Sequence, residues 1–131
     1  MLPKIFEPES EYDLIRLGKD NDGGYLVEKN SVLEAKGLIS MGISYDWSFE
    51  KDFFNIKECP IHCYDPTIKY SSIKKFSRKS IIDLFKIKNI FNKNQLKNNI
   101  DNIFLYNSYK KFFSKKVIHY ESSIGIGRNK V

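Results

Sequence analysis

The chain has 131 residues, of which 41% are hydrophobic and 15% aromatic, so it is about one domain long and carries enough apolar side chains for a core. No stretch approaches the roughly 18 consecutive apolar residues of a membrane span. The N-terminus also lacks the apolar core of a secretory signal, so we expect a cytoplasmic protein without a membrane partner. The formal net charge is +6, with lysines concentrated after Ile68, and we interpret these lysines as solubilising helix faces rather than binding nucleic acid.

The first 36 residues are expected to form a short β-hairpin. The apolar runs Leu14–Leu17 and Tyr25–Val27 flank Lys19–Gly24, whose Asn, Asp and Gly residues tolerate the positive φ angles of a tight reversal. From residue 37 onward, strands and helices are expected to alternate. Gly37–Met41 is short and nearly all apolar, which is typical of a strand buried on both faces of a parallel sheet.

A helix and a second strand follow this first buried strand. After the loop Gly42–Tyr45, apolar residues recur at helical spacing, and Asp46 can cap the first free backbone N–H groups; the apolar residues are Phe49, Phe53 and Ile56. Pro60 ends this helix. Ile61–Tyr64 is the predicted second strand, and it ends at Asp65–Thr67 because proline cannot continue a ladder.

Two amphipathic helices and a third strand complete the pattern. The first helix carries an apolar face of Ile73, Phe76, Ile81, Leu84 and Phe85, and the second carries one of Leu96, Ile100, Ile103 and Phe104. Val117–Tyr120 is the predicted third strand. This alternation predicts an α/β fold with a parallel sheet and flanking helices.

Two positions at strand ends suggest a cofactor site. In an open parallel sheet, ligands bind outside the carboxyl ends of the strands, which is where Gly42 lies. Asp65 follows the next strand roughly 20 residues later, where a carboxylate can accept hydrogen bonds from ribose hydroxyls. Asp46, at the start of a helix, would repel a pyrophosphate and favours a cationic cofactor, S-adenosylmethionine, over NAD. The alternatives are a structural turn at Gly42 and a simple helix cap at Asp46.

Several segments together resemble FkbM-type methyltransferases over about Tyr12 to Thr67. They are Leu14–Gly18, Asn21–Val27, Leu38–Ile43, Asp46–Phe53 and Tyr64–Thr67. The resemblance implies a Rossmann-like fold and methyl transfer from S-adenosylmethionine to an oxygen of a sugar or another small metabolite, for example a glycan. It implies that the loop contacts the methionine portion and Asp65 the ribose, and the expected cofactor contacts are Gly42, Ile43, Ser44, Asp46, Trp47, Asp65 and Thr67.

The hairpin turn is a candidate for the acceptor side of the site. Asp22 and Tyr25 flank Gly23-Gly24 and are candidate substrate-binding residues, with an ordinary hairpin as the alternative. No Ser/His/Asp or Cys/His arrangement is recognisable, and no catalytic base is assigned.

The sequence departs from the family pattern at two points. Ser40 stands where many methyltransferases have an acidic residue, and the family's later Asp-x-Glu-Gly motif is absent. In the family's usual strand order the first strand lies between the second and the fourth, so its far edge is expected to be free. We therefore expect a single partial domain, truncated after the third strand: a fragment, a truncated reading frame or half of a split protein. A complementing chain or dimer partner would cover that edge.

Other patterns carry less weight. Cys59, His62 and Cys63 lie close together, but their spacing does not match paired zinc signatures and His62 and Cys63 would point to opposite faces, so no metal is expected. The two cysteines are expected to be reduced. Gly125–Gly127 is expected to be a turn.

Two alternative functions remain open. One is a basic module for single-stranded nucleic acid, built from Lys110, Lys111, Lys115 and Lys116 with Tyr109, Phe112 and Phe113. The other is a non-catalytic remnant with a scaffold role.

Overall fold

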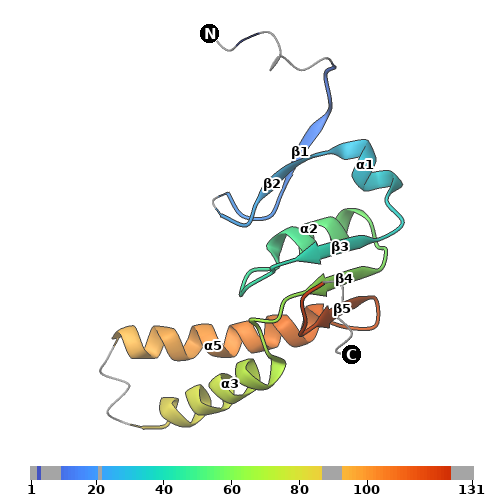
Figure 1. The fold of residues 1–131 in the computed structure, drawn as a ribbon. Coiled ribbons are helices and arrows are strands. Elements are labelled where there is room, and N and C mark those ends of the chain that lie inside the picture. Colours follow the sequence, from blue (N-terminus) through green and yellow to red (C-terminus); the bar gives the residue numbers. More distant parts are fainter. Residues whose placement is uncertain (1–2, 4–9, 21, 87–92, 125–131) are drawn as a thin grey trace, which may run out of the picture.

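The structure is a computed structural model that describes residues 3, 10–20, 22–86 and 93–124. Its elements (Figure 1) are, in chain order, β1 (Leu14–Leu17), β2 (Tyr25–Glu28), α1 (Lys29–Glu34), β3 (Leu38–Met41), α2 (Ser48–Ile56), β4 (Ile61–Tyr64), α3 (Tyr70–Leu84), α5 (Lys93–Phe112) and β5 (Val117–Tyr120).

The predicted hairpin is confirmed. Strands β1 and β2 pair antiparallel, with Leu17 opposite Tyr25. Gly18 and Gly23 have φ angles of +86° and +92°, which L side chains rarely adopt. A Cβ on Gly18 would also lie 2.3 Å from the carbonyl oxygen of Gly23, so this reversal requires glycine.

Helix α1 follows the hairpin directly and was not predicted. Glu28 starts it, because its carboxylate accepts hydrogen bonds from the backbone N–H groups of Asn30 (2.9 Å) and Ser31 (2.5 Å). Val32 alone among its residues is buried. A helix of six residues with a single buried side chain leaves no periodic pattern in the sequence.

The main sheet is parallel and has the order β3-β4-β5. The register aligns Leu38 with Ile61 and Val117 on one face, and Ile39 with His62 and Ile118 on the other. The mixed α/β fold with a three-stranded parallel sheet and a separate hairpin is therefore as expected. Within the described residues β3 pairs on one side only, as predicted for its far edge.

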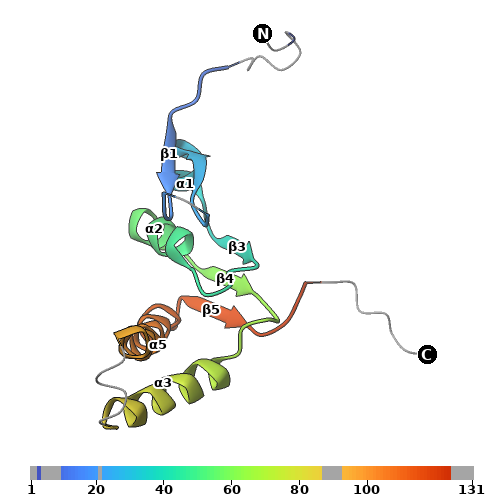
Figure 2. The same cartoon turned by 90° about the vertical axis from the view of Figure 1, so that its left-hand side faces the viewer.

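In the part of the chain that the structure describes, helices cover one face of this sheet and leave the other uncovered. Helices α2 and α5 lie on the same side of the strands, and α3 packs against α5 (Figure 2). On that side Ile61 and Cys63 are fully buried. On the other side Ile39 and Met41 are 66% and 69% exposed, because no described element covers them. The expectation that the first strand is buried on both faces is therefore wrong.

The core lies between the covered sheet face and the helices. Trp47 packs edge-on against Tyr109 and Phe113, with ring centroids 5.7 and 5.5 Å apart. Ile73 of α3 and Phe53 of α2 are also buried. The core is thus closed by Tyr109 of α5, by Phe113 directly after α5 and by Trp47 directly before α2.

The apolar faces predicted for α3 and α5 are only partly correct. In α3, Ile73 is buried, but Phe76 and Phe85 are 51% and 84% exposed, and in α5 Phe104 is 69% exposed. Small polar residues fill the α3–α5 contact instead, where the side-chain amide of Asn102 donates a hydrogen bond to Ser80 at 3.1 Å. Among the described residues, no helix combines the length and apolarity that a membrane crossing requires.

Candidate functional site

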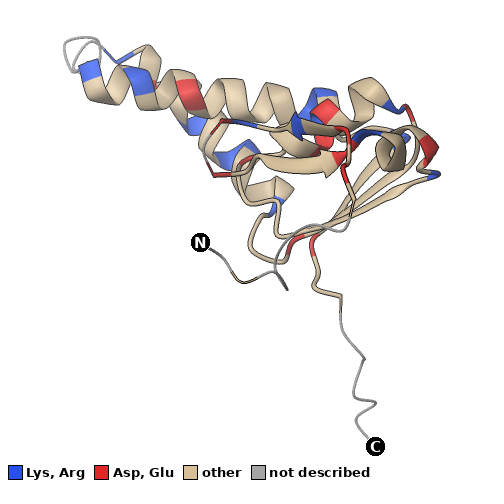
Figure 3. Ribbon diagram, turned by 90° about the horizontal axis from the view of Figure 1, so that it is seen from above, with Lys and Arg blue, Asp and Glu red and all other residues tan. Residues whose placement is uncertain are grey.

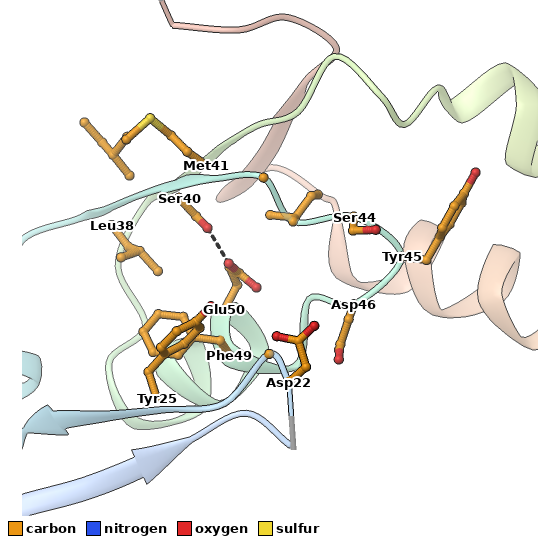
Figure 4. A pocket seen from close by; sticks show the side chains of 14 residues that line it. Asp22, Tyr25, Leu38, Ser40, Met41, Ser44, Tyr45, Asp46, Phe49 and Glu50 are labelled. Carbon is orange, nitrogen blue, oxygen red and sulfur yellow. Dashed lines mark hydrogen bonds between the residues drawn. The ribbon is translucent and has the colours of Figure 1, made fainter. Parts of the chain in front are cut away.

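A pocket of about 540 Å³ opens at the carboxyl end of β3 (Figure 4). Its walls come from β3, the loop after it, the first turn of α2 and the tip of the hairpin. The lining residues are Asp22, Gly23, Tyr25, Leu38, Ile39, Ser40, Met41, Gly42, Ile43, Ser44, Tyr45, Asp46, Phe49 and Glu50. This is the position at which ligands bind in open parallel sheets.

The loop after β3 owes its shape to two residues with positive φ. Gly42 has a φ of +71°, and Ser44 has a φ of +47°. No atom lies within 4 Å of a Cβ built on Gly42, so the backbone angle and not crowding favours glycine there. The Gly42 N–H donates to the carbonyl of Tyr64 (3.0 Å), which ties the loop to β4.

Asp46 caps the start of α2, as predicted. Its Oδ1 accepts a hydrogen bond from the Ser48 N–H at 3.0 Å, and its Oδ2 pairs with Lys19 Nζ at 2.9 Å. Partial burial on its own would raise the pKa of this carboxyl. The hydrogen bonds from Lys19 and Ser48 outweigh burial and hold the pKa below its ordinary value.

The hairpin is fastened to the first half of α2. The Gly18 N–H donates to Asp52 Oδ2 (2.9 Å), and the Lys19 N–H donates to Ser48 Oγ (3.2 Å). Tyr25 also meets Phe49 edge-on, with centroids 5.7 Å apart. These contacts bring the predicted substrate-binding residues Asp22 and Tyr25 to the pocket; their binding role stays a prediction.

Sequence reasoning missed Glu50, which lies in the pocket wall. It is only 5% exposed, and Ser40 Oγ donates a hydrogen bond to its Oε1. Burial raises the pKa of the Glu50 carboxyl above its ordinary value. The available signal was its helical spacing, because Glu50 precedes the buried Phe53 by three residues and therefore shares its face of α2.

The charges of the pocket have one sign. Its charged lining residues are Asp22, Asp46 and Glu50, and no Lys, Arg or His is among the described residues that line it. The whole chain carries a formal charge of +6. Lys and Arg are scattered along helices and loops with Asp and Glu between them (Figure 3). The pocket is therefore an acidic site on a basic protein.

Asp65 ties the loop after β3 to the turn after β4. It is 2% exposed and accepts hydrogen bonds from the Ser44 N–H (2.8 Å), the Thr67 N–H (2.7 Å) and the Thr67 hydroxyl (2.5 Å). Burial would raise its pKa, but these hydrogen bonds outweigh burial and hold the pKa below its ordinary value. Neither Asp65 nor Thr67 lines the pocket. Both carboxylate oxygens of Asp65 already accept hydrogen bonds within the chain, and the predicted contacts of Asp65 and Thr67 with a cofactor stay predictions.

Trp47 is likewise a core residue. It is 5% exposed and packs against Tyr109 and Phe113, outside the pocket lining. The predicted contacts that do meet at the pocket are Gly42, Ile43, Ser44 and Asp46.

The described residues contain no group of three His, Cys, Asp or Glu side chains that could hold a metal ion. Cys63 is fully buried on the helix-covered face of β4. The ring of His62 lies 5.5 Å from that of Tyr120, on the opposite face, as the strand prediction required. Residues Gly125–Gly127 lie outside the part of the chain that the structure describes.

The aromatic residues of the basic stretch belong to the core. Tyr109 is 7% exposed, and Phe112 and Phe113 are half-buried and pack against the core cluster. Lys116 forms an exposed ion pair with Glu58 at 2.8 Å. This arrangement does not present the rings for the base stacking that the nucleic-acid alternative requires.

The acidic pocket at the carboxyl end of β3 is therefore the candidate ligand-binding site. Compared with known proteins, the chain matches no family model, no curated protein and no solved structure.

Proposed function

We propose that the chain is part of a Rossmann-like methyltransferase domain and binds S-adenosylmethionine in the pocket beyond β3. The observation that carries this proposal is the charge of the pocket. Its charged lining residues are all carboxylates, in a chain whose overall charge is +6. A pocket with this lining favours a ligand with positive groups and disfavours one with phosphates.

The position and size of the pocket support the same ligand. It lies outside the carboxyl end of a strand in a parallel sheet, and its volume of about 540 Å³ falls within the 300–1,000 Å³ that is typical of small-molecule sites. Gly42 has no side chain, so its backbone can approach a ligand closely. These features fit a nucleoside joined to an amino acid.

The start of α2 discriminates between adenosine cofactors. A free helix N-terminus attracts the pyrophosphate of NAD. Here Asp46 occupies that position and accepts from the first helical N–H, at Ser48. An anionic ligand would meet this carboxylate, whereas the ammonium and sulfonium groups of S-adenosylmethionine would be attracted by it.

When bound, S-adenosylmethionine supplies an electrophilic methyl group. The chain's own residues would contribute binding and orientation, which is the main source of rate in such transfers. Asp46 and the Gly42–Ser44 loop would hold the ligand, and Asp65 would keep that loop in shape through Ser44. Asp22 and Tyr25 would line the acceptor side, for a hydroxyl of a sugar or another small metabolite.

Isothermal titration with S-adenosylmethionine, S-adenosylhomocysteine and NAD tests the proposal. We expect heat from the first two ligands and none from NAD. Asp46→Asn should weaken S-adenosylmethionine binding about 3- to 10-fold, since it removes one attractive charge. Asp13→Asn is the matched control, because Asp13 also pairs with a lysine, Lys29 at 3.2 Å, but does not line the pocket.

Two results would overturn the proposal. One is the absence of heat with either adenosyl ligand at millimolar concentration. The other is NAD binding as tight as that of S-adenosylmethionine, which would show that the acidic lining does not select the ligand.

A further inference from the structure

Glu50 differs from the other two pocket carboxylates. Asp46 pairs with Lys19 at 2.9 Å, and Asp22 is exposed at the hairpin tip. Glu50 is 5% exposed and lies in the wall behind them, where its hydrogen bond from Ser40 is drawn in Figure 4. It forms no ion pair within the described residues.

The Glu50 carboxylate has hydrogen bonds but no counter-charge among the described residues. Removing an ionised carboxylate from water is costly unless a cation or several hydrogen bonds replace the water. Burial outweighs the hydrogen bonds that the carboxylate accepts from Ser40 and from the backbone N–H of Glu50 itself, and the nearby carboxylate of Asp46 further favours the protonated form. The described residues thus give this buried acid no counter-charge, and Glu50 lines the pocket in which a bound cation would supply one.

We propose that Glu50 is the residue that binds the ammonium group of the ligand and so selects ligands that carry a free amino group. This inference rests on the proposed function. It places the amino-acid part of the ligand against the pocket wall that α2 forms. Ser40 acts with Glu50 as a positioning residue, because its hydroxyl fixes the carboxylate at the end of β3.

The ammonium is a better partner for Glu50 than the sulfonium. A carboxylate on the ammonium holds the ligand equally before and after methyl transfer, because that charge is unchanged. A carboxylate on the sulfonium would favour the state before transfer and would therefore oppose the reaction. Glu50 also lies at the inner wall, next to β3, rather than at the exposed hairpin tip from which an acceptor would enter.

Isothermal titration tests this assignment in a double-mutant-type cycle, in which the protein is changed at Glu50 and the ligand at its amino group. Wild type and Glu50→Gln are each titrated with S-adenosylhomocysteine and with its deaminated analogue, which lacks only the amino group. Gln keeps an oxygen that accepts from Ser40, so the local geometry is retained while the charge is removed. Glu34→Gln is the control, because Glu34 is an exposed acid outside the pocket.

We expect wild type to bind S-adenosylhomocysteine about 10- to 100-fold more tightly than the deaminated analogue, as for a hydrogen bond between charged groups. Glu50→Gln should bind both ligands alike, and Glu34→Gln should behave as wild type. The wild-type ratio alone tests the need for the amino group, even if Glu50→Gln does not fold.

The outcomes separate this inference from the proposed function. Equal binding of both ligands by wild type, or unchanged discrimination in folded Glu50→Gln, overturns the assignment of Glu50 and leaves the proposed function standing. Absence of binding of any adenosyl ligand by wild type overturns both.

Discussion

Replacing Asp65 with alanine tests whether this residue holds the pocket loop or contacts the ligand. The structure gives its carboxylate three hydrogen bonds, from the Ser44 N–H and from the N–H and hydroxyl of Thr67. Alanine removes the acceptor and leaves these donors without a partner at a site that is 2% exposed. We therefore expect a loss of stability in the ligand-free protein, before any cofactor is added.

The expected magnitude follows from these contacts. A hydrogen bond to a charged group contributes about 1.5–3 kcal/mol, and a buried donor left unpaired costs about 1–3 kcal/mol. Allowing for water that reaches the loop, we expect Asp65→Ala to lower the free energy of unfolding by about 3 kcal/mol. That is a large part of the roughly 5–15 kcal/mol of a typical domain. Thr67→Val, which loses one donor, should cost about 1 kcal/mol.

Urea unfolding measured by tryptophan fluorescence is the assay, because Trp47 is the single tryptophan and is buried in the core. The difference between wild type and Asp65→Ala should shrink at acidic pH. The folded-state pKa of Asp65 is lowered, so its contribution is present above the unfolded pKa of about 3.9 and is lost as the pH falls through the folded value. An Asp65→Ala protein within about 0.5 kcal/mol of wild type, but with impaired cofactor binding, would refute the loop role.

Three further predictions concern other parts of the molecule. Burial raises the pKa of the Cys63 thiol to about 12, so we expect this residue to react with Ellman's reagent at pH 8 only as fast as the protein unfolds; labelling at the rate of a free thiol would contradict its burial. Gly42→Ala should cost about 1 kcal/mol from its φ of +71° alone, and Gly18→Ala clearly more because it adds a 2.3 Å clash, as thermal denaturation would show; equal costs would refute the distinction. Changing the exposed Ile39 and Met41 to lysine should alter the free energy of unfolding in urea by no more than about 0.5 kcal/mol, whereas a loss above about 2 kcal/mol would show that these side chains are buried.

Local sequence signals predicted most of the elements. The Gly-rich turn after Leu17 predicts the end of a hairpin strand, and the short apolar run Ile61–Tyr64 predicts a buried strand. Both signals depend on residues that are close together in the sequence. The strand alternation also gave the parallel sheet. The helix faces were less predictable, because α3 and α5 approach each other through small polar residues such as Ser80 while Phe76 remains exposed.

The site was predictable only in part, for a similar reason. The loop from Gly42 to Asp46 follows from strand ends and helix capping, which are local. The role of Asp65 depends on a donor 21 residues earlier, Ser44, and no spacing rule distinguishes a carboxylate that binds a loop from one that binds a ribose. Glu50 was missed because its importance depends on its burial in the pocket wall, which only the folded chain creates.

The uncovered face of the sheet has a consequence for how stability varies with temperature. Side chains such as Ile39 and Met41 keep their hydration water in the folded state, so unfolding exposes less new apolar surface than in a domain with both sheet faces covered. The heat capacity of unfolding should therefore lie below the roughly 1.6–2.0 kcal/mol/K expected from chain length alone, which makes the stability curve flatter. A molecule that covers this face would increase the curvature of stability against temperature. Calorimetry would detect its binding as a larger heat capacity change of unfolding.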